Sequence, residues 1–382
     1  MEQEKTDKKK LNRLVILGNG FDLSLGMKTS YKDFMYNYLR DTLIQIYKDD
    51  ESDRGKYQQG SSLVYDDGLT NWRVPETETP FTILRVISLF NNYDKLSKFL
   101  IDSKYLKYSF DLLTEFHDNS VNGNWTDIEI LYYDSIVKLV KKYSGGITRE
   151  QLLKEYNSKF NKLRLELINY LSTVKPPWLK GERKKDYLKI IPNHSMGLYY
   201  KIFESINGEN EVDEVMILNF NYTNTLDLIH VYLPINFVPN ITHIHGRIIQ
   251  MDSVIFGFGD ELDKDYLMLE SVRSSELFRY IKSPHYFQSP RYKELNKFIN
   301  QGEYEVYIMG HSCGISDRTL LNEIFENKDC KSIRIFYHER EDLSNNKLDS
   351  SIEIMKHFTD KKRMRKIIKD FTDDDKMVQL KI

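Results

Sequence analysis

Six short apolar runs, each bounded by turn-forming residues, limit what this chain can fold into. They are LVIL (14–17), VMIL (215–218), ITHI (241–244), VIFGF (254–258), YEVYIM (304–309) and SIRIFYH (332–338). Near-continuous apolar runs of this length are typical of strands that are covered on both faces. Most of them are separated by helix-like segments, at about 31–47, 223–231, 261–281, 290–301 and 316–327. This alternation predicts an α/β fold with a Rossmann-like, mostly parallel sheet of about six strands.

The second apolar run begins nearly two hundred residues after the first. Apolar residues at spacings of three and four predict helices in most of that interval, over 94–117, 126–143, 148–173 and 195–207. Residues 48–80 are rich in Gly, Ser, Asp, Thr and Pro, and they predict a long irregular excursion. The expected organisation is a disordered basic tail (1–12), a nucleotide-binding core (13–47 and 209–340), a largely helical insertion (48–208) and a C-terminal helical extension (341–382).

Composition disfavours several classes of protein. The chain has 55 Lys and Arg against 57 Asp and Glu, and its formal net charge of -2 gives no general attraction for nucleic acid. Its two cysteines, Cys313 and Cys330, are too few for a four-cysteine zinc site and favour a reducing, cytoplasmic location. No apolar run approaches the ~20 residues that span a bilayer. The charged N-terminal residues do not resemble a signal peptide, so no membrane association is expected.

Glycines and polar residues follow five of the predicted strands. The segments are Gly18-Asn19-Gly20-Phe21-Asp22, 219–224, 243–246, 257–260 and 310–317. Ligands of parallel α/β sheets bind at the carboxyl ends of the strands, so we expect these segments to converge on one site. Gly18 and Gly20 leave room for a phosphate and allow backbone N–H groups to point at it. Valine at either position is expected to abolish dinucleotide binding without unfolding a turn that lies near the surface.

Each of these segments also has a purely structural explanation. Glycines occur at strand-turn-helix junctions without any ligand, and Leu23 stands where a full dinucleotide fingerprint has its third glycine. Asn224 can cap one helix and Asp317 another. His243 and His245 share a face of their strand and could bind zinc, but no third ligand is obvious nearby. Packing alone explains His245 poorly, because Gly246 follows it directly.

Five motifs occur in a recognisable order along most of the chain. They are Gly-Asn-Gly-Phe-Asp (18–22), WTDIE (125–129), FNYT (220–223), HIHG (243–246) and GHSCGISD (310–317). Together they resemble the AbiH family of phage abortive-infection proteins. More remotely, they resemble the sirtuin-like NAD-binding fold of bacterial NAD-consuming defence proteins. The resemblance implies a sirtuin-like fold, an antiphage function and NAD as substrate or ligand.

Residue roles follow from the sirtuin-like resemblance. It implies that Asn221 and His245 are catalytic. It implies a cofactor-binding set of Gly18, Asn19, Gly20, Phe21, Asp22, Gly310, Ser312 and Asp317. This sequence departs from the sirtuin pattern at Asp22, where sirtuins usually have Ser, and at Thr223, where an Asp often follows the Asn. No arginine follows the first turn, which continues as Gly26-Met27-Lys28-Thr29.

The chemistry implied is hydrolysis of NAD. Cleavage of the nicotinamide–ribose bond passes through an oxocarbenium-like state, which needs a positioned water and no metal. Asn221 would orient the water or the ribose hydroxyls, and His245 would accept a proton near neutral pH. We therefore expect an NAD glycohydrolase that forms a homo-oligomer and responds to a phage-derived trigger or partner protein. Protein deacylation is disfavoured, because sirtuin deacylases generally carry a four-cysteine zinc module.

Two other functions remain open. If Asp127 and Glu129 reach Asp22, the three carboxylates could bind Mg²⁺ in a metal-dependent nuclease or phosphodiesterase. Thr126 and Glu129 also fit a helix capping box, which explains them without a metal. The second alternative is a nucleotide-sensing interaction module without turnover, in which the helical insertion binds a partner.

Overall fold

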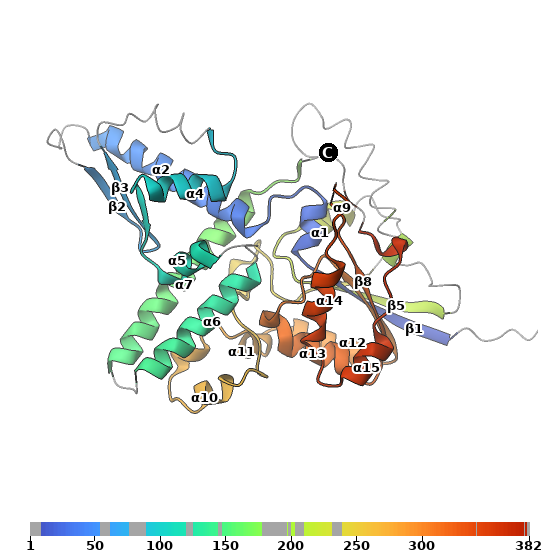
Figure 1. Cartoon of the computed structure of the whole chain (residues 1–382). Helices are drawn as coiled ribbons and strands as arrows, with labels where there is room; N and C mark the ends of the chain where they lie inside the picture. The colour runs from blue at the N-terminus through green and yellow to red at the C-terminus, as the bar shows by residue number, and fades with distance from the viewer. Residues whose placement is uncertain are drawn as a thin grey trace, which may run out of the picture. The chain divides into compact units, whose positions relative to one another are not determined.

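The computed structural model describes residues 9–53, 62–75, 89–119, 125–143, 147–177, 197, 200–202, 210–230, 239–340, 342–377 and 379. The chain divides into two compact units (Figure 1). Unit 1 comprises Met1–Met27, Val174–Ser271 and Tyr280–Ile382, and unit 2 comprises Lys28–Thr173 and Val272–Arg279. Most of the predicted tail (1–12) and of the predicted helix 195–207 lies outside the described residues, as does the side chain of Thr126.

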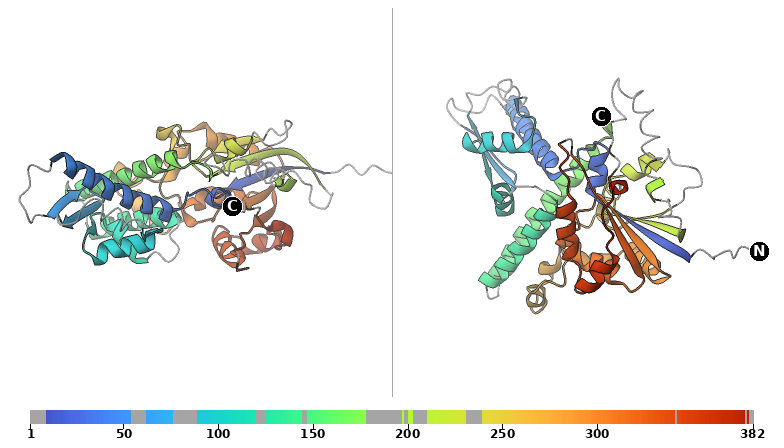
Figure 2. Two further views of the ribbon diagram at one scale, coloured as in Figure 1. Left: turned by 90° about the horizontal axis from the view of Figure 1, so that it is seen from above. Right: turned by 45° about the vertical axis from the view of Figure 1, so that its right-hand side comes forward.

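A five-stranded, all-parallel sheet forms the centre of unit 1. Its strands are β1 (Lys9–Leu17), β5 (Asn210–Asn219), β6 (Asn240–His243), β7 (Tyr304–Met309) and β8 (Cys330–Phe336). Their spatial order is β6-β5-β1-β7-β8, and Figure 2 shows β1 (blue) among them. The chain builds one half outward from β1 to β6 and then crosses over to β7. This is the strand order of a Rossmann-like sheet, with its topological switch point between β1 and β7.

The strands end in register at their carboxyl ends. Leu17 of β1 is paired with Asn219 of β5 on one side and with Met309 of β7 on the other. Asn219 is paired in turn with His243 of β6. The residues that follow β1, β5, β6 and β7 therefore emerge at one edge of the sheet. The predicted α/β class and parallel pairing of these strands are confirmed.

Helices cover both faces of the sheet, which explains the continuous apolar runs. The helices of unit 1 are α1 (Asn19–Ser24), α9 (Thr225–His230), α10 (Tyr266–Glu270), α11 (Lys282–Tyr286), α12 (Pro290–Asn300), α13 (Arg318–Glu326), α14 (Lys347–Met355) and α15 (Lys361–Ile367), with short 3-10 turns η3 (Met251–Ser253), η5 (Ile315–Asp317) and η6 (Asp373–Asp375). Leu14 and Ile16 pack with residues of α12 and α13, whereas Val15 and Leu17 pack with residues of α1 and α9. All four side chains are fully buried. Each such side chain stabilises the fold by about 1.5–3 kcal/mol.

Unit 2 is mainly helical, and all of it except Val272–Arg279 lies between β1 and β5 in the sequence, where helices were predicted for most of the interval. Its helices are α2 (Tyr31–Asp53), α4 (Tyr93–Asp102), α5 (Asp111–Asn119), α6 (Trp125–Lys142), α7 (Ile147–Thr173) and the 3-10 turn η4 (Ser275–Phe278). A small antiparallel sheet has the order β2-β3-β4, with β2 (Ser62–Asp66), β3 (Thr70–Pro75) and β4 (Leu106–Tyr108). The prediction of one helix over 94–117 is wrong, because β4 separates α4 from α5 and Lys104 has a positive φ of 58°.

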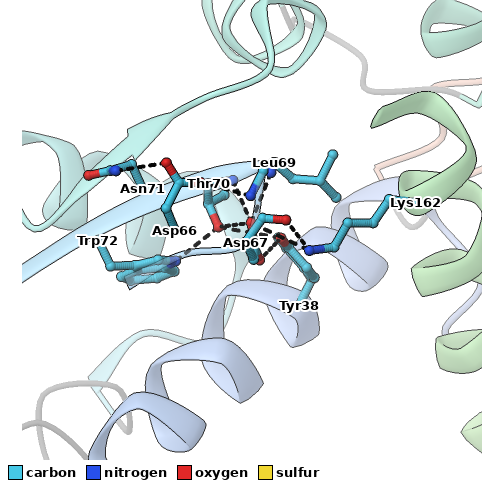
Figure 3. A network of polar contacts seen from close by, with 9 residues as sticks. Tyr38, Asp66, Asp67, Leu69, Thr70, Asn71, Trp72 and Lys162 are labelled. Atoms are coloured by element: carbon cyan, nitrogen blue, oxygen red, sulfur yellow. Dashed lines mark hydrogen bonds and ion pairs between the residues drawn. The ribbon is translucent and has the colours of Figure 1, made fainter. Parts of the chain in front are cut away.

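The prediction of an irregular excursion over 48–80 is wrong for β2 and β3, which form a hairpin. Figure 3 shows the Asp67 carboxylate at the turn, where its Oδ1 accepts the N–H groups of Leu69 (2.9 Å) and Thr70 (2.7 Å). The hydroxyl of Tyr38, on α2, donates to Asp67 Oδ2 at 2.5 Å, and Lys162 of α7 donates to the Asp67 carbonyl. Asp67 thus fixes the turn and ties the hairpin to two helices, through its carboxylate to α2 and through its backbone carbonyl to α7.

Residues 254–258 do not form the predicted strand. Phe258 makes only an isolated parallel bridge with Ile281, and Gly257 has a positive φ of 154°. The segment is apolar because it is buried, not because it belongs to the sheet. The predicted helix over 261–281 is also wrong, because this stretch contains only the short α10 and η4. No helix in the described ranges is long and apolar enough to cross a membrane.

Candidate functional site

At the switch point, the residues that follow β1 and the loop that follows β7 pack against each other through backbone atoms. The Gly20 N–H donates to the Gly310 carbonyl at 2.8 Å, and the Gly18 N–H donates to the Met309 carbonyl at 3.1 Å. A Cβ on Gly20 would lie 2.8 Å from the Gly310 oxygen, and a Cβ on Gly310 would lie 2.2 Å from the backbone nitrogen of Phe21. Gly310 also has a positive φ of 70°. The glycines therefore allow a close approach between two loops of the same chain.

This packing corrects the geometry expected for Gly18 and Gly20. Their N–H groups were expected to point at a phosphate, but they donate to carbonyl groups at the end of β7 and in the loop after it. Gly18 is buried, whereas Asn19 and Gly20 are half-buried, so the turn is only partly accessible. Valine at Gly18 is consequently not expected to leave the fold intact, since its Cβ would lie 2.5 Å from the Cα of His311.

We expect Gly18→Ala to destabilise the protein by about 1–3 kcal/mol, the usual effect of overpacking. The matched control is Gly302→Ala, whose Cβ would meet only Asn12 Nδ2 at an ordinary 3.7 Å. Thermal unfolding followed by circular dichroism measures both. Equal midpoints for the two variants would contradict a packing role for Gly18.

A first group of polar side chains holds Gly18 and α1, which together are called the β1 loop, to the loop that follows β5. This Asp22 cluster consists of Asp22, Asn219, Asn221, Thr223 and His243. The Asn221 amide donates to the Gly18 carbonyl at 3.0 Å and to Asp22 Oδ1 at 3.3 Å. Thr223 donates its hydroxyl to Asp22 Oδ2 at 2.5 Å, and Asn219 Oδ1 accepts the Asn221 N–H at 2.9 Å. Asn221 is thus a fixed part of the interface between two strand-end loops.

The Asp22 carboxyl is buried, with 1% of its surface exposed. Burial raises its pKa to about 7, although hydrogen bonds from Thr223 and Thr225 act in the opposite direction. A carboxyl that is largely satisfied by protein donors and partly protonated at neutral pH is poorly suited to binding Mg²⁺. Asp22 belongs to unit 1, whereas Asp127 and Glu129 belong to α6 of unit 2. Within the described residues, no group of three or more His, Cys, Asp or Glu could hold a metal ion.

A second group of polar side chains surrounds the carboxylate of Asp317. This Asp317 cluster consists of His245, Lys282, Tyr286, His311 and Asp317. Asp317 Oδ1 lies 2.7 Å from Lys282 Nζ and 3.2 Å from His245 Nε2, and Oδ2 lies 3.7 Å from His311 Nε2. The Tyr286 hydroxyl lies 3.1 Å from His245 Nε2. The loops after β6 and β7, together with α11 and η5, bring these side chains together.

Burial and mutual contact set the charges in the Asp317 cluster. Burial alone would raise the pKa of Asp317, but Lys282 and His245 hold that pKa well below its usual range. Burial and the charge of Lys282 lower the pKa of His245, and burial lowers the pKa of His311 to about 4. At neutral pH the cluster therefore contains one Lys–Asp ion pair and two neutral imidazoles. The contact between His245 and Asp317 is a hydrogen bond and not an ion pair.

The hydrogen-bond partners assign the tautomers of the two imidazoles. A carboxylate only accepts, so the proton of neutral His245 lies on Nε2 and its basic lone pair lies on Nδ1. His311 Nδ1 accepts the backbone N–H of Cys313 at 3.0 Å, so the Nε2 proton of His311 faces Asp317. His245 is thus oriented to accept a proton at Nδ1.

The two residues predicted to be catalytic lie in two different polar clusters. Asn221 lies in the Asp22 cluster and His245 in the Asp317 cluster, while the ring of Phe220 packs against His245 with centroids 4.9 Å apart. Phe21 is a core residue, with 2% of its surface exposed. Ser312 is exposed and Asn19 is half-buried.

Sequence reasoning missed Lys282 and Tyr286. Both lie on α11, in a segment whose local pattern contains no sign of a site. His311 stood within a quoted motif, but it was not selected as a site residue. Asp317 was selected for binding NAD, and its observed partners are three basic side chains.

The fold and this site define an α/β protein with a Rossmann-like parallel sheet and buried polar clusters at its carboxyl edge. Residues 14–339 match the family described as Bacteriophage abortive infection AbiH. This match spans most of the 382 residues, so the chain belongs to the AbiH family of abortive-infection antiphage proteins. No curated protein and no solved structure matches the chain. The predicted AbiH membership is confirmed, and the sirtuin-like resemblance stays a prediction.

Proposed function

We propose that this AbiH protein is a sirtuin-like effector that binds NAD at the carboxyl edge of the sheet and hydrolyses its nicotinamide–ribose bond. The observation that carries the proposal is the contact of His245 Nε2 with Asp317 Oδ1 at 3.2 Å. It provides a buried, neutral imidazole, oriented by a carboxylate, at the edge where Rossmann-like sheets bind nucleotides. A base of this kind contributes roughly 10²–10⁴-fold to a reaction rate.

In the proposed reaction, water attacks the anomeric carbon of the nicotinamide ribose. The carbon–nitrogen bond breaks, and neutral nicotinamide leaves with the bonding electron pair. His245 Nδ1 accepts the proton of the attacking water, which leaves ADP-ribose as the second product. Asp317 stabilises the imidazolium that forms, because its oxygen accepts the proton that remains on Nε2. No metal takes part in this scheme.

The other predicted residues have distinct roles in this proposal. The NH₂ group of Asn221 holds the β1 loop, and its side-chain oxygen would accept a hydrogen bond from the water or a ribose hydroxyl. Among the predicted cofactor-binding residues, Asn19 and Ser312 are more accessible than the buried Phe21 and Asp22, so they would contact the dinucleotide directly. The proposal includes a homo-oligomer that a phage component activates.

A nucleotide sensor without turnover is the second candidate. The observation that favours it is that the Gly18 and Gly20 N–H groups already bond to the chain's own carbonyl groups. A ligand that needs these N–H groups must first separate the two loops, which would convert binding into a conformational signal.

Mass spectrometry of small molecules tests these candidates. Phage-infected cells that produce the protein should yield nicotinamide and ADP-ribose. Purified protein incubated with NAD and an extract of infected cells should yield the same products, with or without EDTA. Binding of ADP-ribose without any loss of NAD would favour the sensor. Constant NAD in infected cells that the protein still kills would overturn the hydrolase proposal, and EDTA-sensitive degradation of nucleic acid would favour a nuclease.

A further inference from the structure

Lys282 is a buried cation to which the proposed reaction assigns no role. Only 1% of its side chain is exposed, and its Nζ lies 2.7 Å from Asp317 Oδ1. Lysine is almost never fully buried unless it is paired, because removing an ammonium from water is costly. The ion pair with Asp317 offsets this cost.

The Gly257-Phe258-Gly259 segment fixes the backbone of Lys282. The Phe258 N–H donates to the Tyr280 carbonyl at 3.0 Å, and the Lys282 N–H donates to the Phe258 carbonyl at 2.8 Å. A Cβ on Gly257 would lie 2.0 Å from the Tyr280 oxygen, and a Cβ on Gly259 would lie 3.2 Å from Lys282 Cβ. These glycines therefore allow the backbone approach that directs Lys282 into the Asp317 cluster.

Gly259 also ties this segment to the element that carries Asp317. Its carbonyl accepts the N–H of Thr319 at 3.0 Å, in the first turn of α13. The two partners of the ion pair are thus placed by neighbouring backbone contacts, although 35 residues separate them in the sequence. These backbone contacts therefore determine the position of Lys282 in the fold.

We propose that Lys282 is a positioning residue of this site, whose fixed positive charge keeps Asp317 ionised and keeps His245 in its neutral, proton-accepting form. The use of His245 as a base rests on the proposed NAD hydrolysis. The effect of Lys282 on the protonation of His245 does not depend on any reaction.

The groups around His245 give the direction of this effect. The charge of Lys282 lowers the pKa of His245 and the charge of Asp317 raises it, while Tyr286 contributes a neutral hydroxyl. His311 faces the second oxygen of Asp317, and His357 lowers the pKa of His311. Without the Lys282 charge, the Asp317 carboxylate would favour protonated imidazoles. A protonated His245 cannot accept a proton.

The test is a histidine NMR titration of the full-length protein. The signal of His245, among nine histidines, is identified by its absence in His245→Gln. We expect the pKa of His245 to rise by about 1 unit or more in Lys282→Met, within the range known for a neighbouring charge. Lys282→Arg should return it toward the wild-type value. An unchanged pKa in folded Lys282→Met would overturn the proposal.

The wild-type titration is a second test, which does not require any variant to fold. A neutral histidine that donates to a carboxylate would ordinarily titrate above the reference pKa of about 6.5. We expect His245 to titrate below it, because burial and the Lys282 charge both lower its pKa, and a value above it would overturn the neutral His245 on which the proposal depends. If NAD is also turned over, Lys282→Met should move the acid limb of kcat/KM to higher pH. Failure of NAD hydrolysis alone would leave both NMR results interpretable.

Discussion

Asp317→Asn is expected to destabilise the protein by about 3–5 kcal/mol, the usual cost of removing one partner of a buried ion pair. The substitution preserves the size of the side chain, so the effect comes from the Lys282 ammonium, which would stay buried without its counter-charge. His245 would also lose the carboxylate that orients it. Thermal unfolding at neutral pH measures the loss as a lower midpoint.

The matched control is the double variant Asp317→Asn with Lys282→Met. Replacing both members of a buried ion pair by neutral groups is often nearly neutral for stability. The double variant should therefore recover most of the stability that Asp317→Asn loses. If the two substitutions instead add their losses, the ion pair does not determine the stability of the Asp317 cluster.

His245→Gln is expected to reduce NAD hydrolysis by roughly 10²–10⁴-fold, the contribution of a general base. Glutamine can donate its amide to Asp317, but it cannot accept a proton at neutral pH. We therefore expect little change in stability, together with loss of NAD consumption and of killing in infected cells. NAD measured by mass spectrometry, beside thermal unfolding, separates the two effects.

The control for this variant is His338→Gln, the same exchange at an exposed histidine. It should leave NAD consumption unchanged. The pKa of His245 is lowered, so neutral base persists below the ordinary histidine pKa, and the rate should fall only as pH drops through the lower value. Continued NAD loss in His245→Gln would exclude this imidazole as the base.

Local sequence signals were sufficient for the parallel sheet but not for every apolar run. LVIL and YEVYIM are buried because neighbouring strands and helices cover them, and these runs are apolar for that reason. VIFGF is equally apolar, yet Gly257 has a positive φ and Phe258 makes a single bridge. Hydrophobicity reports burial and does not report which backbone groups pair. By contrast, Asp67-Gly68 was a recognisable hairpin signal that the sequence analysis overlooked.

The candidate site shows the same division between local and tertiary information. His245 and Asp317 were found because they follow strands, and the carboxyl edge of a parallel sheet attracts attention from sequence alone. Lys282 gave no signal, because its burial depends on contacts with Phe258 and Asp317, which are distant in sequence. The packing of Gly18 against the loop after β7 was also hidden, since a glycine turn has the same sequence whether it faces a ligand or another loop.

The central position of β1 has a consequence for synthesis of the chain. Of the five strands of this sheet, β1 is made first, but both of its neighbours, β5 and β7, come much later in the sequence. At ~5–20 residues per second, roughly 190 residues between β1 and β5 correspond to about 10–40 seconds on the ribosome. During that time the apolar residues 14–17 have no partner strand, so the nascent chain must keep them from pairing elsewhere. The strand that joins the two halves of the sheet is therefore synthesised first, and its pairing cannot be completed until β7 has been made.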